Sequence, residues 1–149
     1  MKRIFAGTAI AILLVTIGII WIDEKPAQHP NVVAKMTLGM KKWQWVSTIY
    51  GYGTEVKPAN ANNFTLTFQS NGKFSAGTDC NLVGGRYVVK AEFFRFTDMV
   101  STQMYCANSQ ERDFIQMLKQ TQSYFFNPKG QLVFNLTNNS GSFVFKEMV

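Results

Sequence analysis

Residues 64–75 read FTLTFQSNGKFS, and this stretch decides the fold class. Phe64, Leu66 and Phe68 alternate with polar residues, which is the period of a strand that buries one face. Residues 70–73 then predict a tight hairpin turn, because Asn-Gly readily takes the positive φ angles that such a turn needs. The chain therefore forms an antiparallel hairpin here.

The sequence on either side repeats this strand pattern. Short aromatic and β-branched runs predict further strands at residues 43–50, 86–90, 92–97, 124–127, 131–136 and 142–146. Turn residues at 128–130 and 138–141 separate the last three of these strands. The domain is therefore predicted to be mostly β.

One helix is expected after residue 110. Asn108 or Ser109 can cap it, and Glu111 and Asp113 fall in its first turn, near the positive end of the helix dipole. Four apolar residues fall on one side of it: Phe114, Ile115, Met117 and Leu118. We expect this helix to cover the sheet, with its apolar stripe in the core.

The N-terminus carries a long apolar run. Residues 4–22 hold no charge, and a helix of that length spans about 30 Å of hydrocarbon. A cleaved signal peptide is the alternative, but its apolar run is shorter, at about 7 to 15 residues, and small residues follow it. Here the run ends in Trp21 and Ile22, followed by acidic residues. We therefore expect residues 1–22 to be an uncleaved signal-anchor, a transmembrane helix.

The charges on either side of this run predict its orientation. Lys2 and Arg3 precede it, whereas Asp23 and Glu24 follow it. Basic flanks stay on the cytoplasmic side. The chain is therefore predicted to be a single-pass inner-membrane protein whose C-terminal domain lies in the periplasm, or outside the cell.

Residues 23–42 form the predicted tether, with Pro26 and Pro30 among polar neighbours and no sustained period of 2 or 3.6. The folded domain is predicted to occupy residues 43–149. Its length and aromatic content are sufficient for a sizeable core.

The chain carries a net charge of +6, from 15 basic and 9 acidic residues. Apart from Lys2 and Arg3, the basic residues are scattered along the sequence, with one other doublet at Lys41 and Lys42. Binding to phosphates needs several clustered cations. We therefore expect no nucleic-acid partner.

The two cysteines, Cys80 and Cys106, both lie in the exported part. An even count in an oxidising compartment favours one disulfide, and two buried thiols are the alternative.

Four segments follow one another in a familiar order: Asp-Cys-Asn at 79–81, Gly-Gly-Arg-Tyr at 84–87, Ser-Thr-Gln-Met-Tyr-Cys at 101–106 and the Glu-started helix at 111–118. Together they resemble the META domain family, which includes HslJ-like heat-shock proteins, and the match extends from Trp43 to about Lys146. The resemblance implies an α+β, mostly β fold: a strongly bent or partly closed antiparallel sheet with one helix. It also implies an envelope protein linked with the stress response, without a general catalytic activity.

Two residues depart from the family pattern. Asp79 stands where Gly is usual, and Leu82 stands where a polar or basic residue is common. The first puts in doubt any function that needs bare backbone at this turn, and the second makes the site less polar.

The motif residues have a structural interpretation and a functional one. Asn81 can bond nearby backbone, Gly84 and Gly85 allow a bulge, and Tyr87 and Met104 can fill the core beside the cysteines. The functional alternative is a recognition surface, for which the candidate residues are Asp79, Asn81, Arg86, Thr102 and Met104.

The sequence gives little support for a catalytic site or a metal site. The sole histidine, His29, lies in the predicted tether, so a Cys-His or Ser-His pair in the domain is not expected. Two cysteines and a remote histidine do not supply the three or four ligands of a zinc site. We expect no enzyme activity, cofactor or metal.

Three functions remain open. The favoured one is an anchored envelope module that supports stress tolerance through a protein partner in the same envelope. The second is a small binding module for a lipid, a hydrophobic compound or a glycan. The third is an inhibitor of an envelope hydrolase that uses residues 50–54 as a wedge.

Overall fold

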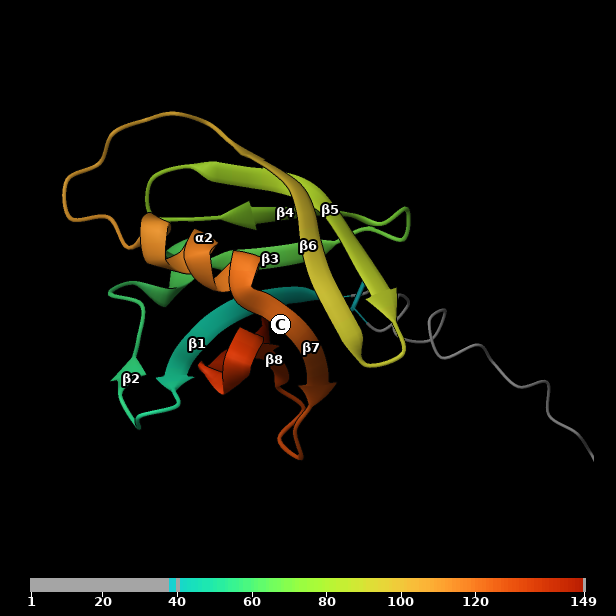
Figure 1. Ribbon diagram of the computed structural model, residues 1–149. Helices are drawn as coiled ribbons and strands as arrows, with labels where there is room; N and C mark the ends of the chain where they lie inside the picture. The colour runs from blue at the N-terminus through green and yellow to red at the C-terminus, as the bar shows by residue number, and fades with distance from the viewer. Residues whose placement is uncertain (1–37, 40, 149) are drawn as a thin grey trace, which may run out of the picture.

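The computed structural model describes residues 38–39 and 41–148, and in this part nine strands form one antiparallel sheet (Figure 1). The strand order is β2-β1-β3-β4-β5-β6-β7-β8-β9, and β9 also pairs with β1. The sheet therefore closes into a barrel, with β2 attached outside the ring. The elements are β1 (Lys42–Tyr50), β2 (Glu55–Val56), η1 (Ala61–Asn63), β3 (Thr65–Phe68), β4 (Lys73–Gly77), β5 (Leu82–Lys90), β6 (Phe93–Ser101), α2 (Glu111–Gln120), β7 (Thr121–Phe126), β8 (Leu132–Leu136), η2 (Thr137–Asn139) and β9 (Gly141–Met148).

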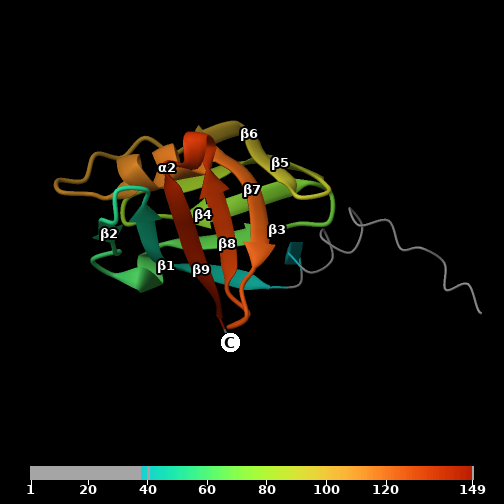
Figure 2. The same cartoon turned by 60° about the horizontal axis from the view of Figure 1, so that its bottom comes forward.

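The barrel has a strong closure and a weak seam. β1 and β9 pair along their whole length, from Lys42 opposite Met148 to Tyr50 opposite Gly141. In contrast, β6 and β7 are paired at one position, Phe93 opposite Ser123. Helix α2 lies between these two strands in the chain and packs beside β6. Figure 2 shows β7, β8 and β9 side by side on the wall that continues from the seam.

Aromatic rings fill the interior of the barrel. The ring centroid of Trp45 lies 5.1 Å from that of Phe64 and 5.7 Å from those of Phe114 and Phe143. Phe114, on α2, is fully buried, together with Met117 and Leu118 at 2% exposure or less. The apolar stripe of the helix therefore closes the core, as the sequence predicts.

The hairpin at residues 64–75 is confirmed. Leu66 and Phe68 are buried, and the predicted turn has Gly72 at φ +80°. The Gly72 amide donates to the Gln69 carbonyl at 3.1 Å, and the Gln69 amide donates to the Lys73 carbonyl at 2.8 Å. Glycine is required here because a side chain is strained at this φ.

Several elements differ from their predicted bounds. β5 begins at Leu82 and β6 ends at Ser101, so both strands are longer than expected, and β2 was not predicted. The expected bulge near Gly84 and Gly85 is present as a register shift, and the residue with positive φ lies opposite it, at Asp98. The ends of these strands are set by pairing with neighbouring strands, which cannot be read from the local residue pattern.

The predicted N-terminal transmembrane helix, at residues 1–22, lies outside the described residues. Among residues 38–39 and 41–148, no helix is both long and apolar enough to cross a membrane. Leu38 is fully buried, and Trp43 Nε1 donates to its carbonyl at 3.4 Å. Leu38 and the first residue of β1 thus lie within the segment 23–42 that the sequence assigns to the tether.

Candidate functional site

The two cysteines join two loops at one end of the barrel. Cys80, between β4 and β5, forms a disulfide with Cys106, in the loop from β6 to α2, with an S–S distance of 2.08 Å and a Cα–Cα distance of 5.7 Å. The disulfide expected from the cysteine count is thus present. We call this end of the barrel, formed by residues 78–82 and 102–113, the disulfide end.

Asn81 is the centre of the polar contacts at this end. Its side chain is 5% exposed and makes four hydrogen bonds. Nδ2 donates to the Met104 carbonyl at 3.1 Å and to Glu111 Oε1 at 3.0 Å. Oδ1 accepts from Thr102 Oγ1 at 2.7 Å and from the Met104 amide at 2.8 Å. One amide side chain thus ties the 102–104 backbone to the start of α2.

Thr78 and Glu111 complete this network. Glu111 Oε2 accepts from the Asn81 amide at 2.8 Å and from Thr78 Oγ1 at 2.5 Å. Thr78 Oγ1 in turn accepts from the Asn81 amide at 2.8 Å and from the Cys80 amide at 3.2 Å. The Glu111 carboxylate is therefore used to hold the loop, because both of its oxygens accept hydrogen bonds.

Asp79 caps α2 from a different element. Its Oδ2 accepts from the Gln110 amide at 2.8 Å, and its Oδ1 accepts from Ser109 Oγ at 2.5 Å. Ser109 Oγ accepts from the Glu111 amide at 3.0 Å, so this predicted capping residue does bind the first turn. Asn108, the other predicted cap, adopts φ +59° in the preceding loop. A negative charge at this helix end is favourable because of the helix dipole.

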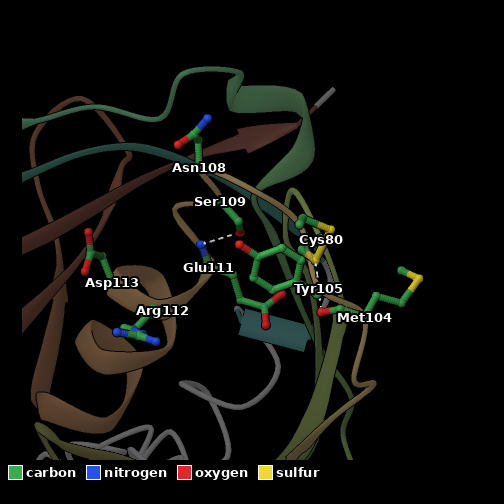
Figure 3. A pocket seen from close by; sticks show the side chains of 9 residues that line it. Cys80, Met104, Tyr105, Asn108, Ser109, Glu111, Arg112 and Asp113 are labelled. Carbon is green, nitrogen blue, oxygen red and sulfur yellow. Dashed lines mark hydrogen bonds between the residues drawn. A yellow bond between two sulfur atoms is a disulfide. The ribbon is translucent and has the colours of Figure 1, made fainter.

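A surface hollow of about 400 Å³ lies beside the disulfide. Figure 3 shows Met104 and Tyr105 on the loop side of this hollow and Arg112 and Asp113 on the helix side. Cys80 and Cys106 also line it. The hollow is thus walled by a cross-linked loop and the first turn of a helix.

Apolar side chains point outward around the disulfide. They are Leu82 (68% exposed), Val100 (71%), Met104 (63%) and Tyr105 (93%), and we call them the apolar rim. Val100 lies opposite Gly84, which places it on the same outer face as Leu82, two residues away on β5. Clustered exposed apolar residues are typical of interaction surfaces.

The structure brings four of the five candidate residues to this end. Asn81 binds both Thr102 and Met104, and Asp79 binds the residues at the start of α2. Arg86 is separate, because it sits on the outer face of β5 opposite Lys73 and Thr97.

The expectation that Met104 and Tyr87 fill the core beside the cysteines is wrong for Met104. Its side chain is 63% exposed, and Asn81 binds its backbone. Tyr87 is buried, but its hydroxyl donates to the Gln69 carbonyl at 2.8 Å, away from the disulfide.

Thr78 and Glu111 belong to the network, although the sequence pattern does not assign them to it. The sequence places Glu111 in the first turn of the helix and in the family motif, but not in contact with the 78–81 turn. An acidic first-turn residue can also accept from a neighbouring loop, and this was the one available signal. Thr78 carries no signal, because its role depends on the fold of the 78–81 turn.

Two stacked tyrosines border the same end. The rings of Tyr50 and Tyr52 lie 5.5 Å apart and nearly parallel. Burial raises the pKa of Tyr50, and the carboxylate of Asp113 and the Tyr52 hydroxyl raise the pKa further. Tyr52 is 78% exposed, at the tip of the 50–54 loop.

The polar groups of the disulfide end hold its loops in place. Both oxygens of Asp79 and of Glu111 already accept hydrogen bonds, so the carboxylates organise the loops. Within residues 38–39 and 41–148, no group of three or more His, Cys, Asp or Glu side chains is placed to hold a metal ion.

Comparisons with known proteins agree with this fold. A sequence model described as META domain matches residues 36–148. No curated protein sequence matches the chain.

Three solved structures are similar in fold. An NMR structure of a protein from Burkholderia xenovorans has a TM-score of 0.65 at 20% identity, covering 80% of this chain and 89% of that one. A crystal structure of a DUF4847 family protein from Bacteroides vulgatus has a TM-score of 0.58 at 13% identity, covering 75% and 95%. A further NMR structure has a TM-score of 0.54 at 17% identity, covering 75% and 92%.

Proposed function

This chain belongs to the META domain family, and from that premise we propose that it is a non-enzymatic envelope protein whose disulfide end binds a protein partner. In this proposal residues 4–22 anchor it in the inner membrane and the barrel lies in the periplasm. The binding supports tolerance of envelope stress. The tether confines the barrel near the membrane and raises its effective concentration toward partners in the same envelope.

One observation carries this proposal: the apolar rim stands on a rigid base. Met104 and Tyr105 are exposed, but the Met104 backbone is held at both its amide and its carbonyl by Asn81. The disulfide fixes the next residue, Cys106. A preorganised loop loses little conformational entropy on binding, which favours recognition. Tyrosine is also among the residues enriched at binding hot spots.

The packed interior disfavours the alternative of a lipid or drug held inside the barrel. Phe94 lies 4.8 Å from Phe96 and 4.9 Å from Phe134 between ring centroids, and all three are nearly or fully buried. A ligand cavity in a small barrel would need these rings to be replaced by smaller side chains. The surface of the disulfide end is the better-supported binding region.

The proposal is tested with a double variant, Leu82→Ser with Tyr105→Ser, in cells that lack the wild-type chain. We expect the loss of tolerance to heat or detergent stress, because both side chains leave the apolar rim. Tyr52→Ser is the matched control, since it removes an exposed tyrosine from the 50–54 loop. Immunoblotting checks that the variants accumulate equally and keep their disulfide. Full tolerance in the double variant would contradict the proposal, and loss in Tyr52→Ser alone would favour the hydrolase-inhibitor alternative.

A further inference from the structure

We propose that the outer face of β4, β5 and β6 docks on the anionic surface of the membrane that anchors the chain. The inference rests on the proposed anchor and adds a second surface to the protein. Six outward side chains define this surface, which we call the basic face: Lys73, Arg86, Val88, Lys90, Phe93 and Arg95.

The sheet register gathers charges that are scattered in the sequence. Lys73 lies directly opposite Arg86, and Arg95 lies opposite Val88, next to Arg86 on the same face. Like charges directly opposite each other destabilise a sheet. Among the described residues, the ion pairs are Lys41 with Glu147 and Lys57 with Glu55, so the cations of the basic face have no acidic partner. An anionic surface would supply one.

The neighbouring acidic groups lie at the borders of this face. Glu92 is in the turn between β5 and β6, and Asp98 is at the irregular position of β6, where φ is +51°. The four cations of the face therefore outnumber its two bordering carboxylates.

Apolar groups lie between the charges. Val88 is 49% exposed and Phe93 is 41% exposed. The Arg95 guanidinium carbon lies 5.4 Å from the centroid of the Phe93 ring. Basic residues alternating with an aromatic and an aliphatic side chain suit the headgroup region of a bilayer, where charge meets phosphate and apolar groups reach the acyl boundary.

The position of the basic face favours a membrane over a free polyanion. Lys42, where the chain enters the barrel, pairs with Thr67, beside the turn that leads to Lys73. The β5–β6 turn lies at this same end in Figures 1 and 2, and the disulfide is at the opposite end of β5. The apolar run at residues 4–22 precedes this entry point. An anchored chain would therefore hold the basic face toward the lipid and the apolar rim away from it.

The test uses the full chain reconstituted in nanodiscs, with a fluorescent non-canonical amino acid at position 93 and spin-labelled lipid headgroups as the quencher. We expect strong quenching with phosphatidylglycerol and several-fold weaker quenching with phosphatidylcholine alone. Neutralising one cation should weaken docking about fivefold. The triple variant Lys73→Gln, Arg86→Gln, Arg95→Gln should therefore dock at least tenfold more weakly.

Two controls separate docking from simple proximity. A probe at Tyr105, on the apolar rim, should stay unquenched in both lipids. The matched triple variant Lys57→Gln, Arg112→Gln, Lys119→Gln removes the same charge away from the entry end and should keep the quenching at position 93. Tryptophan fluorescence checks that each variant is folded, and a variant that fails this check is replaced by the corresponding single substitutions.

Equal quenching at positions 93 and 105, or quenching that ignores the phosphatidylglycerol content, would overturn the inference. If added DNA abolished the quenching at position 93 while the chain stayed in the nanodiscs, the basic face would be assigned to nucleic acid. That result would overturn the inference as well. A chain that does not enter the nanodiscs would instead contradict the anchor of the proposed function. In that case the docking would be tested by adding the free chain to phosphatidylglycerol vesicles: binding would support it, and no binding would overturn it.

Discussion

At the residue scale, Asn81 is the side chain on which the disulfide end depends. It binds the Met104 backbone, Glu111 on α2 and Thr78 in the 78–81 turn. The residue is 5% exposed, and losing its four side-chain bonds would deprive Thr102 Oγ1, the Met104 backbone and Glu111 Oε1 of this partner.

We therefore expect Asn81→Ala to lower the free energy of unfolding by about 2–4 kcal/mol. Urea unfolding followed by the fluorescence of the buried Trp43 and Trp45 measures the change. Asn135→Ala is the control, because Asn135 donates one side-chain bond, to Ser123 Oγ at 3.0 Å. This variant should lower the free energy of unfolding by about 1 kcal/mol or less. Equal losses in the two variants would contradict the central role of Asn81.

Gly85 is required by packing. A Cβ at this position would lie 2.7 Å from Phe74 Cε1 and 2.7 Å from the Thr97 carbonyl oxygen, whereas a Cβ at Gly84 would meet its nearest atom at 3.8 Å. We expect Gly85→Ala to destabilise the protein by about 1–3 kcal/mol and Gly84→Ala to change stability little. Thermal unfolding of both variants tests this. A Gly85→Ala variant as stable as Gly84→Ala would show that Phe74 can move away at no cost.

At the scale of elements, the sequence predicted those whose pattern is local. The alternation at residues 64–68, the Asn-Gly turn and the apolar stripe of α2 each bury their own residues, so pattern and structure agree. Partners distant in sequence were not predictable in this way. The two-residue strand β2 is defined by its pairing with Thr48 and Ile49 of β1. Met104 is held through its backbone by Asn81, and its side chain is exposed.

The candidate site shows the same division. The cysteine count and the expected compartment predict the disulfide, and Asn81 is among the candidate residues. The family motif groups Arg86 with them at one end of the sheet, but β5 carries it away from the disulfide end toward Lys73. The basic face was missed for the converse reason, since its charges become neighbours through strand register alone.

The start of α2 depends on Asp79, one of the two residues that depart from the family pattern. It satisfies the Gln110 amide and fixes Ser109, which in turn binds the Glu111 amide. We expect Asp79→Ala to lower the free energy of unfolding by about 1 kcal/mol and to speed amide exchange in the first turn of α2. Hydrogen exchange by NMR measures both effects. Glu92→Ala removes an exposed carboxylate from a turn and should leave α2 unchanged. Unaltered exchange in Asp79→Ala would mean that Ser109 caps the helix alone.

At the scale of the whole molecule, stability should fall at alkaline pH. Burial raises the pKa of Tyr87 and of Tyr124 above the ordinary value of 10.0. Their protonated forms are thus favoured in the folded state, so this contribution is complete below about pH 10 and is lost as pH rises through the folded pKa. Urea midpoints between pH 8 and 11 should be flat and then decline.

The matched variants identify the groups responsible. Tyr87→Phe should flatten the alkaline decline, although it lowers stability at pH 8 by removing the bond to the Gln69 carbonyl. Tyr105→Phe alters a tyrosine that is 93% exposed and should leave the decline unchanged. A decline of the same slope in Tyr87→Phe would exclude this tyrosine as a cause.

The barrel as a whole separates two surfaces. The chain enters at one end, beside the basic face, and the disulfide and the apolar rim occupy the other. In the proposed arrangement the first surface meets the lipid, and the second is presented to the protein partner in the envelope. The aromatic core and the β1–β9 closure keep the two at a fixed distance.

Photo-crosslinking in living cells tests the central claim most directly. A photoreactive phenylalanine analogue at position 105 samples the apolar rim, and the same analogue at Lys129, in the β7–β8 turn at the entry end, serves as the control. We predict one reproducible protein adduct at position 105 that is absent at position 129 and is lost with Leu82→Ser. Adducts of equal strength at both positions, or none at position 105, would contradict a binding surface at the disulfide end.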